Sequence, residues 1–430
     1  MMDEFAAYVG IDWADEKHDL ALLPTGQAKE EHRQLDQTPE AIDAWATELR
    51  QRFGGQSVAI CLEQSKGGLI YALMKYDFLV LYPINPKQLA RFREALAPSG
   101  SKDDPTDAAL CLRLLVKHRD QLQPWRPDDA QTRLIRILGE DRRGLIAQRT
   151  RLCNQLQDRL KQVFPLALDV LGSLTTELAA EFLARYSSFE ELKAAPPKEV
   201  AALYRLYGLG QAKTEERLQR IAAAVPLTTD SALVQSGRLL VRSLATQLNA
   251  LAEPLRQYEQ QLADAMRQHP DAPIFTSFPG AGDALAPRLL AAFGADRERL
   301  DSAAQMQNLT GIAPVTRRSG KSFAVLRRWA CSKFLRQTFH EFAQHSIPRS
   351  AWAKAYYQMQ RERGKKTPRG DPRFGVQVDP HPLSLLERPL RLQRSALLPR
   401  PQKTPRPPLR PPGRLRLTLL PKTPNQTPTT

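Results

Sequence analysis

Short apolar runs and helix-like spacings alternate along the first part of the chain. Apolar runs bounded by polar or turn residues predict strands, and they occur at residues 8–11, 18–23, 57–62 and 78–84. Apolar residues recur at helical intervals at residues 40–52 and 68–76. A polar turn at residues 14–17 joins the first two strands as a hairpin. Strands that alternate with helices predict an α/β layer over residues 1–125.

The middle of the chain has long, charged, helix-like stretches in which turn residues are scarce. Leucine-rich stripes at three-, four- and eight-residue intervals predict amphipathic or coiled-coil helices, first from Leu134 to Val163 and again from Leu233 to Leu262. We therefore expect a helical/coiled-coil spacer over residues 126–268. Two interpretations stay open: the stripes pack only against each other as an antiparallel hairpin, or they also hold protomers together.

A third unit, richer in turn residues and basic side chains, follows over residues 269–366. We expect a mainly α C-terminal domain. Residues 277–282 and the apolar helix after them have the pattern of a helix-hairpin-helix turn, in which Gly280 and Gly282 would let backbone N–H groups approach a phosphate. A tight turn between two helices, without any ligand, explains the same glycines equally well.

The last segment, residues 367–430, has a different composition. It contains fifteen of the 34 prolines and is rich in arginine, so it cannot pack a core and is expected to be disordered. Residues 370–381 can be back-translated so that a shift of one nucleotide encodes an amphipathic helix. The hypothesis is a frameshifted tail, which would leave this copy unstable or inactive and would be tested by reading the codons after Arg369.

Composition indicates a partner with negative charge. The chain has 430 residues, a formal net charge of +16 and a pI near 9.8, and excess Lys and Arg favour nucleic acid. Roughly half of this excess lies in the tail. Four cysteines lie far apart, without the spacing of a zinc site or a disulfide framework. Because no apolar run reaches the length of a bilayer crossing, we expect no membrane partner and a cytoplasmic, nucleoid-associated protein.

Acidic residues stand at the positions where predicted strands end and a helix begins. Asp12 closes the first strand, Glu63 closes the strand 57–62, and Asp104 and Asp107 open a helix. Such carboxylates could converge at one sheet edge, as in a nuclease of the RNase H type, and hold Mg²⁺, or Mn²⁺ in its place. Lys102 adds a cation that could steer a phosphate toward them.

Each acid also has a structural explanation. Asp12 could cap a turn, and Asp104 and Asp107 suit the N-cap and third position of a helix. Glu63 is harder to explain without a partner, because a carboxylate beside a buried strand is costly unless a cation or donor pairs with it. Capping and metal binding are compatible for the pair on the helix, since residues three apart face the same way.

A serine surrounded by cations stands near the end of the third unit. Residues 311–322 contain Ser319 with Arg317, Arg318 and Lys321. A nucleotide-binding P-loop is excluded, since the position that requires its first glycine is Val315. Ser319 could grip a phosphate passively or attack one while the cations neutralise the developing charge. The residues alone favour passive binding, because most serines in basic loops are only donors.

Taken together, these segments resemble the DEDD-type insertion-sequence transposases, the family whose RNA-guided members are called bridge recombinases. The resemblance covers about residues 6 to 365. The segments that carry it are Gly10-Ile11-Asp12, Glu63 with Gly67 close behind, Ile84-Asn85-Pro86 followed by Lys102, Asp104, Asp107 and Ala108, then Phe278-Pro279-Gly280-Ala281-Gly282, and Gly311-Ile312-Ala313-Pro314 followed by Ser319-Gly320.

The resemblance implies an α/β RNase H-like (RuvC-like) N-terminal domain, a coiled-coil connection and a C-terminal transposase domain. It implies that Ser319 is the nucleophile and that the metal ligands are Asp12, Glu63, Asp104 and Asp107. It also implies a dimer or tetramer in which the serine of one subunit completes the acidic site of another. The partners would be donor and target DNA and a structured noncoding guide RNA, which would read sequence by base pairing.

Two other functions stay open from the residues alone. A Holliday-junction nuclease would use the same acids with water as nucleophile and would not need Ser319. An inactive remnant would bind nucleic acid without forming any covalent adduct.

Overall fold

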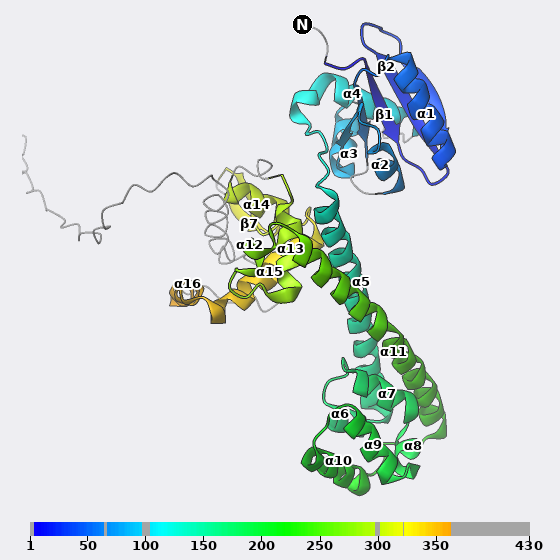
Figure 1. The fold of residues 1–430 in the computed structure, drawn as a ribbon, viewed down its shortest axis with the longest axis vertical. Helices are drawn as coiled ribbons and strands as arrows, with labels where there is room; N and C mark the ends of the chain where they lie inside the picture. Colours follow the sequence, from blue (N-terminus) through cyan, green and yellow to red (C-terminus); the bar gives the residue numbers. More distant parts are fainter. Residues whose placement is uncertain (1–3, 64–66, 97–103, 297–301, 321, 363–430) are drawn as a thin grey trace, which may run out of the picture. The chain divides into compact units, whose positions relative to one another are not determined.

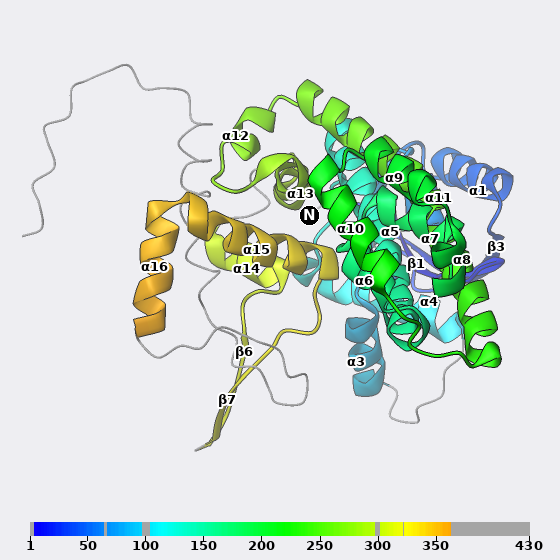
Figure 2. The same ribbon diagram turned by 90° about the horizontal axis from the view of Figure 1, so that it is seen from below.

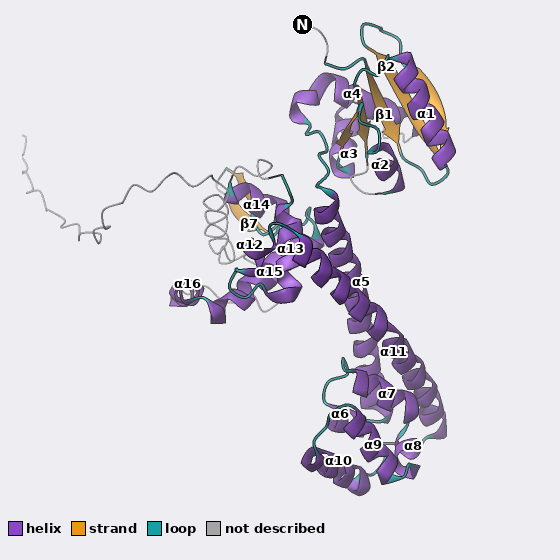
Figure 3. Cartoon of the chain, in the orientation of Figure 1, coloured by secondary structure: helices purple, strands orange, loops and turns teal. Residues whose placement is uncertain are grey.

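The computed structural model describes residues 4–63, 67–96, 104–296, 302–320 and 322–362. The chain divides into two compact units, Met1–Asp129 and Ala130–Thr430. Figure 1 follows the chain through both units, and Figure 3 shows that the strands are concentrated in the first unit while helices dominate the second. The tail at residues 367–430, with its expected frame change, lies outside the described residues.

The first unit is a mixed five-stranded sheet with helices on both faces. The strand order is β3-β2-β1-β4-β5, in which β1, β2 and β3 are antiparallel neighbours and β1, β4 and β5 are parallel neighbours. This is an RNase H-like topology. Its strands are β1 (Ala7–Asp12), β2 (Lys17–Pro24), β3 (Glu31–Asp36), β4 (Val58–Leu62) and β5 (Leu79–Pro83), and its helices are α1 (Pro39–Arg52), α2 (Gly68–Leu73), α3 (Pro86–Leu96), α4 (Asp104–His118) and the short 3₁₀ helix η1 (Arg119–Gln121).

Each face of the sheet packs a separate apolar core, because alternate residues of a strand point to opposite faces. On one face Val9, Ile60 and their neighbours pack against Trp45 of α1 and against α2. On the other face Cys61 and the central strands pack against α3 and α4, including Leu115. The parallel strand β4 is buried along its whole length, as expected for a central strand covered on both faces.

The predicted hairpin, the two later strands and the two helices between them are confirmed. The strand β3 was missed, because its sequence EHRQLD is exposed at every residue except Leu35. Helix α4 begins at Asp104, one residue before the start that an N-cap at Asp104 predicts.

The second unit begins with two long helices, α5 (Ala130–Val163) and α11 (Ser231–Gln268), that pack side by side. Asp230 caps α11 by accepting from the Ala232 and Leu233 amides at 2.8 and 3.0 Å. Five shorter helices connect them: α6 (Leu166–Leu171), α7 (Glu177–Arg185), α8 (Phe189–Ala194), α9 (Pro197–Leu206) and α10 (Gln211–Ala223). The predicted long helices are therefore confirmed, although Leu134 and Ile137 of the first stripe are 48% and 44% exposed.

The C-terminal part of the second unit is mainly helical, with one two-stranded ribbon. Its aromatic core, centred on Phe275, Phe293 and Phe339, also contacts Ile135 of α5 and Leu262 of α11. The elements are α12 (Ala272–Thr276), α13 (Gly282–Phe293), α14 (Ala303–Thr310), β6 (Val315–Ser319), β7 (Ser322–Leu326), α15 (Lys333–Ser346), the 3₁₀ helix η2 (Ile347–Arg349) and α16 (Ala351–Glu362). Within the described ranges, no helix combines the length and the apolar character that a membrane crossing requires.

Candidate metal centre and nucleophile

Two of the predicted acids stand at the same end of neighbouring parallel strands. Asp12 is the last residue of β1 and Glu63 directly follows β4. The register pairs Ile11 with Leu62, so Asp12 and Glu63 come next on each strand. Because side chains alternate, both belong to the face on which Cys61 packs against α4. The edge of the sheet thus carries two carboxylates on one face.

Helix α4 lies directly on β1 at Gly10. A Cβ added to Gly10 would lie 2.0 Å from the Ala108 carbonyl oxygen and 2.4 Å from the Leu112 amide nitrogen. The backbones of the strand and the helix can therefore approach this closely only because the strand has a glycine here. Gly10 stands two residues before Asp12, and Ala108 directly follows Asp107, so this contact brings the first turn of α4 near the acidic edge.

The direction of α4 also brings its first turn to this edge. At the other end of the helix, Arg119 donates to the Tyr8 hydroxyl at 3.3 Å and pairs with Glu4 at 3.2 Å. Tyr8 and Glu4 lie at or before the start of β1, whereas Asp12 ends it. The helix therefore runs antiparallel to β1, and its N-terminal residues Asp104 and Asp107 belong at the end with Asp12.

Asp107 is almost fully buried and forms an ion pair with Arg93 of α3. The side chains are 3% and 19% exposed, and the Arg93 guanidinium donates to Asp107 Oδ2. The second carboxylate oxygen, Oδ1, is buried without a hydrogen-bond partner among the described residues, and so is Arg93 Nε. A buried oxygen of this kind is costly unless a cation or donor satisfies it. Oδ1 therefore lacks the cation or donor that its burial calls for, while Arg93 donates to Oδ2.

Asp12 and Glu63 both interact electrostatically with the thiol of Cys111 on α4. A hydrogen bond with Cys61 and burial raise the pKa of Cys111 well above its ordinary value, and the Cys61, Asp12 and Glu63 charges raise it further. Negative charges disfavour the thiolate. Both carboxylates therefore lie close enough to α4 to act on one buried group.

Asp12, Glu63 and Asp107 belong to the same edge of the sheet, but their side chains do not form one metal-binding cluster. No group of three His, Cys, Asp or Glu side chains that could hold a metal ion occurs among the described residues. The side chain of Asp104 and the whole of Lys102 lie outside the described residues. The four-carboxylate site therefore stays a prediction, in which Asp12, Glu63 and Asp107 come from adjoining parts of the fold.

Asp19 of β2 was missed by the sequence reasoning. It pairs directly with Asp12 across the antiparallel register, so both side chains belong to the face covered by α4. Gln34 donates to Asp19 at 3.1 Å. The predicted turn at residues 14–17 lies midway between Asp12 and Asp19, so the symmetry of the hairpin was the signal that could have identified it.

Ser319 lies in an exposed ribbon rather than in a flexible loop. It ends β6 and pairs directly with Ser322 of β7. Figure 2 shows the ribbon extending away from α14 and α15. By alternation, Arg317 shares a face with Ser319 and Ser322, whereas Arg318 belongs to the other face. Lys321 lies outside the described residues.

The predicted helix-hairpin-helix turn has the expected shape, with α12 and α13 on either side of it. A Cβ on Gly280, which has φ +84°, would lie 2.5 Å from the His345 carbonyl oxygen. Packing against the end of α15 therefore explains this glycine. Gly282 has φ +51° and nothing within 4 Å, so it alone leaves backbone open to a ligand. Phosphate binding by the two glycines stays a prediction.

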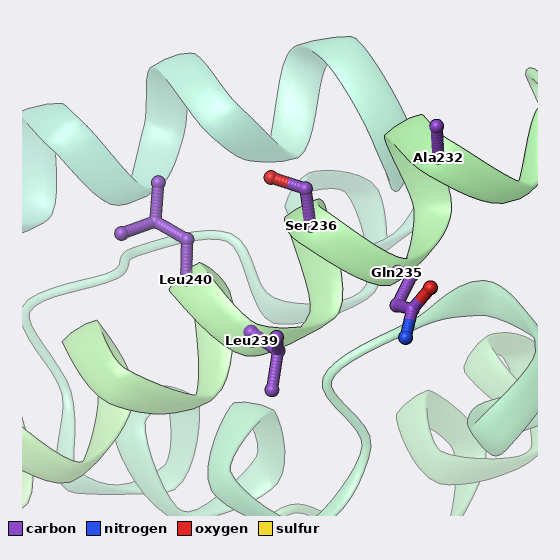
Figure 4. Close-up of a pocket in the computed structure, with 5 residues that line it drawn as sticks. All are labelled: Ala232, Gln235, Ser236, Leu239 and Leu240. Carbon is purple, nitrogen blue, oxygen red and sulfur yellow. The ribbon is translucent and has the colours of Figure 1, made fainter.

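An open groove lies on the N-terminal part of α11, where part of the second leucine stripe is exposed. Leu233 and Leu240 of the stripe are 48% and 39% exposed, and Leu239, which is not part of the stripe, is 61% exposed. Figure 4 shows the residues along this groove, which are Ala232, Gln235, Ser236, Leu239 and Leu240. The stripe is therefore only partly used by the packing of α11 on α5, and the rest is apolar surface.

Two family models match the chain. A model of DEDD transposases of the IS110 type, described as a transposase, matches residues 9–165. A model described as the transposase IS116/IS110/IS902 family matches residues 272–358. The first range contains the four predicted acids, and the second contains Ser319.

Similar proteins come from insertion elements of several bacteria. The chain is 28% identical over 384 residues to the mini-circle transposase for IS117 of Streptomyces coelicolor, covering 84% of this chain and 89% of that protein. It is 26% identical over 355 residues to the 44.8 kDa protein of insertion element IS116 of Streptomyces clavuligerus, covering 81% of each. It is 28% identical over 272 residues to the 42 kDa protein of insertion element IS900 of Mycobacterium paratuberculosis, covering 62% of this chain and 66% of that protein.

Proposed function

Because the chain belongs to the IS110 family of DEDD transposases, we propose that it cuts and rejoins DNA strands for its insertion sequence with Ser319 as the nucleophile. Transposase function and DNA binding follow from the family. The identity of the nucleophile, the metal ligands, the subunit arrangement and the guide RNA are the proposal.

The acidic edge of the first unit would hold the divalent cation, Mg²⁺ or Mn²⁺. Asp12, Glu63, Asp104 and Asp107 would be its ligands, since carboxylate oxygens suit hard cations. The buried oxygen Oδ1 of Asp107, which has no partner among the described residues, is the feature that fits a cation. When bound, such an ion withdraws charge from a phosphate and stabilises the departing oxygen. Arg93 would keep Asp107 oriented through Oδ2.

Ser319 would exchange one phosphate ester for another. Its Oγ loses a proton and forms a bond to phosphorus, while the bond from phosphorus to a sugar oxygen breaks and that oxygen takes up a proton. The product is a phosphoserine link between protein and DNA. Attack by a sugar hydroxyl of a second strand reverses these bond changes and releases Ser319. One ester replaces another at each step, so the exchange needs no external energy source.

Arg317 would neutralise the phosphate that Ser319 attacks. Alternation places its side chain on the same face of the ribbon as Ser319. A guanidinium can bind two phosphate oxygens with paired hydrogen bonds, and its charge opposes the negative charge that develops during the attack. Arg318, on the other face, would bind DNA away from the reacting phosphate, and Lys321 would also bind DNA.

The working unit would be a dimer or tetramer in which Ser319 of one subunit acts with the acids of another. The exposed leucines of α11 support this, since apolar surface along a long helix suits contact with a second copy. A structured noncoding RNA would select donor and target DNA by base pairing. The protein itself would then bind the sugar-phosphate backbone of the DNA and catalyse cleavage and joining of the strands.

One observation carries the proposal: Asp12 and Glu63 end adjacent parallel strands on the face covered by α4. The test incubates the protein with its RNA, Mg²⁺ and end-labelled DNA of the element junction, followed by denaturing electrophoresis. We expect a labelled band of protein size, which Ser319→Ala and Asp12→Asn both abolish. Mass spectrometry of the DNA-linked peptide then identifies the modified residue.

Ser322→Ala is the matched control, because Ser322 is exposed and directly opposite Ser319 on the same face. We expect Ser322→Ala to retain the adduct. Cleavage without an adduct would favour the junction nuclease that uses water. DNA binding without cleavage by the unmutated protein would favour an inactive remnant, and an adduct mapped to Ser322 would contradict the assignment of Ser319.

A further inference from the structure

The ribbon that carries Ser319 and the segment directly after it each expose a large aromatic side chain. Phe323 of β7 is 66% exposed and Trp329, three residues after the strand, is 76% exposed. By contrast, Phe339 and Phe342 of the neighbouring helix α15 are buried in the aromatic core of this part. The Phe323 and Trp329 rings are therefore not used in the folding of the C-terminal part, and their exposure needs another explanation.

The surroundings of these rings are basic. Between Ser302 and His340 the sequence has no Asp or Glu and seven Lys or Arg residues. The guanidinium of Arg327 lies over the Trp329 ring, 4.9 Å from its centroid. Among the described residues, neither Arg317 nor Arg318 forms an ion pair with an acid. The ribbon therefore combines exposed rings with uncompensated positive charge.

The register brings a ring and a cation together on the face opposite Ser319. Phe323 pairs directly with Arg318, and this pair adjoins the pair of Ser319 with Ser322. Directly opposed residues on adjacent strands have side chains on the same face, about 5 Å apart at Cβ. The Phe323 ring and the Arg318 cation are therefore one residue pair along the ribbon from the Ser319 hydroxyl.

This combination suits a nucleic-acid strand better than a protein surface. Protein interfaces are also enriched in Arg and aromatic residues, so the discriminating feature is the charge of one sign. The seven Lys or Arg residues between Ser302 and His340, without any acid, suit a polyanion. Strand-binding proteins combine cations along the backbone with aromatic rings on which bases stack. A base inside a duplex cannot reach such a ring, so the strand must have unpaired bases here.

We propose that Phe323 and Trp329 form a stacking platform for unpaired bases of the DNA strand whose phosphate is presented to Ser319. This inference rests on the proposed function and adds the form of the substrate to it: a strand opened next to the cut. Arg318 and Arg327 bind the backbone phosphates beside the stacked bases. Stacking is insensitive to base identity, so the platform suits a protein whose sequence selection lies elsewhere.

The test measures binding in a Ser319→Ala background, so that it does not depend on covalent chemistry. The ligands are element-junction DNA with a short unpaired stretch at the cut, the same DNA fully paired, and the unpaired DNA with abasic sites. Phe323→Leu and Trp329→Leu remove the rings and keep apolar side chains. Tyr71→Leu, at an aromatic residue of the first unit that is 41% exposed, is the control.

We expect each ribbon variant to bind the unpaired DNA about five- to 150-fold more weakly, the range that corresponds to ~1–3 kcal/mol for one stacked base. The loss should disappear with abasic DNA and be small with paired DNA. The dependence of binding on salt should not change, because no charge is removed. Tyr71→Leu should bind like the background protein.

Equal binding by all variants, or an equal loss with abasic DNA, would overturn the stacking platform. The unpaired stretch is also tested as RNA of the same sequence, and a loss of binding confined to that RNA would overturn the assignment to DNA. Thermal unfolding of each variant shows whether the ribbon change has affected folding. Because the covalent adduct is measured separately in proteins with Ser319, the platform and the nucleophile can fail independently.

Discussion

Gly10→Ala tests the close approach of α4 to β1, on which the position of the acidic edge depends. The added Cβ would lie 2.0 Å from the Ala108 carbonyl oxygen and 2.4 Å from the Leu112 amide nitrogen. Real Cβ contacts essentially never fall below 3.0 Å, so the helix and strand must separate by at least about 1.0 Å. Both obstructing atoms belong to the backbone, and no side-chain rotation can relieve the contact.

The expected cost follows from this geometry. Overpacking a core costs about 1–3 kcal/mol when side chains can adjust, so a contact between backbones should cost about 3 kcal/mol or more. A displacement of about 1 Å in a catalytic group can also reduce activity about 100-fold. Because α4 carries Asp104 and Asp107, we expect Gly10→Ala to lose DNA cleavage even at temperatures where the protein stays folded.

The assay is hydrogen exchange of the backbone amides in β1 and α4, together with DNA cleavage. Gly144→Ala is the matched control, because Gly144 lies within α5 and an added Cβ meets nothing within 4 Å. Alanine in a helix interior should stabilise α5 by about 1 kcal/mol. Faster exchange in β1 and α4 for Gly10→Ala and slower exchange in α5 for Gly144→Ala are predicted. Unchanged exchange and cleavage for Gly10→Ala would refute the reasoning.

Three further predictions follow from individual contacts. Arg93→Met should destabilise the first unit by about 3–5 kcal/mol in urea unfolding, because the buried Asp107 charge loses its partner. Adding Asp107→Leu to this variant should recover most of the lost stability. If the effects of the two substitutions on the free energy of unfolding simply add, the ion pair is contradicted. Burial raises the pKa of Tyr204 to about 12, above its value near 10 in the unfolded chain. The neutral Tyr204 phenol therefore contributes fully to the free energy of unfolding below pH 10, and this contribution is lost as the pH rises toward 12. Titration of tyrosinate absorbance in wild type and Tyr204→Phe checks this, and full ionisation near pH 10 without unfolding would contradict it. Gly280→Ala should lower the melting temperature through contact with His345, whereas weaker DNA binding at unchanged stability would favour the phosphate-binding interpretation.

The parts of the fold that bury residues in a regular pattern could be predicted from the sequence. The strand β4 is buried at all five residues, and its apolar run is unmistakable. The strand β3 has only Leu35 buried, and its pairing with β2 depends on the rest of the sheet. The ribbon of β6 and β7 has no buried face, so neither strand has the alternation that would distinguish it from a loop.

The acids at strand ends could be located because apolar runs end there. Asp12 and Glu63 needed only the strand boundaries and the parallel arrangement. Asp19 required the register of the hairpin, and Arg93 required the packing of α3 beside α4. Contacts between separate elements leave no mark in the local sequence. For the same reason, the leucine stripes indicated helices but not that Leu233 and Leu240 would stay exposed.

The most direct test of the central claim is the binding of Mn²⁺ to the protein without nucleic acid. Electron paramagnetic resonance of free Mn²⁺ during a titration measures how many ions bind and how tightly. The wild-type protein should bind Mn²⁺ at the acidic edge, and Asp12→Asn and Glu63→Gln should each weaken that binding at least tenfold, whereas Ser319→Ala should not. Equal binding by the wild type and both acid variants would contradict the claim that these carboxylates form a metal centre.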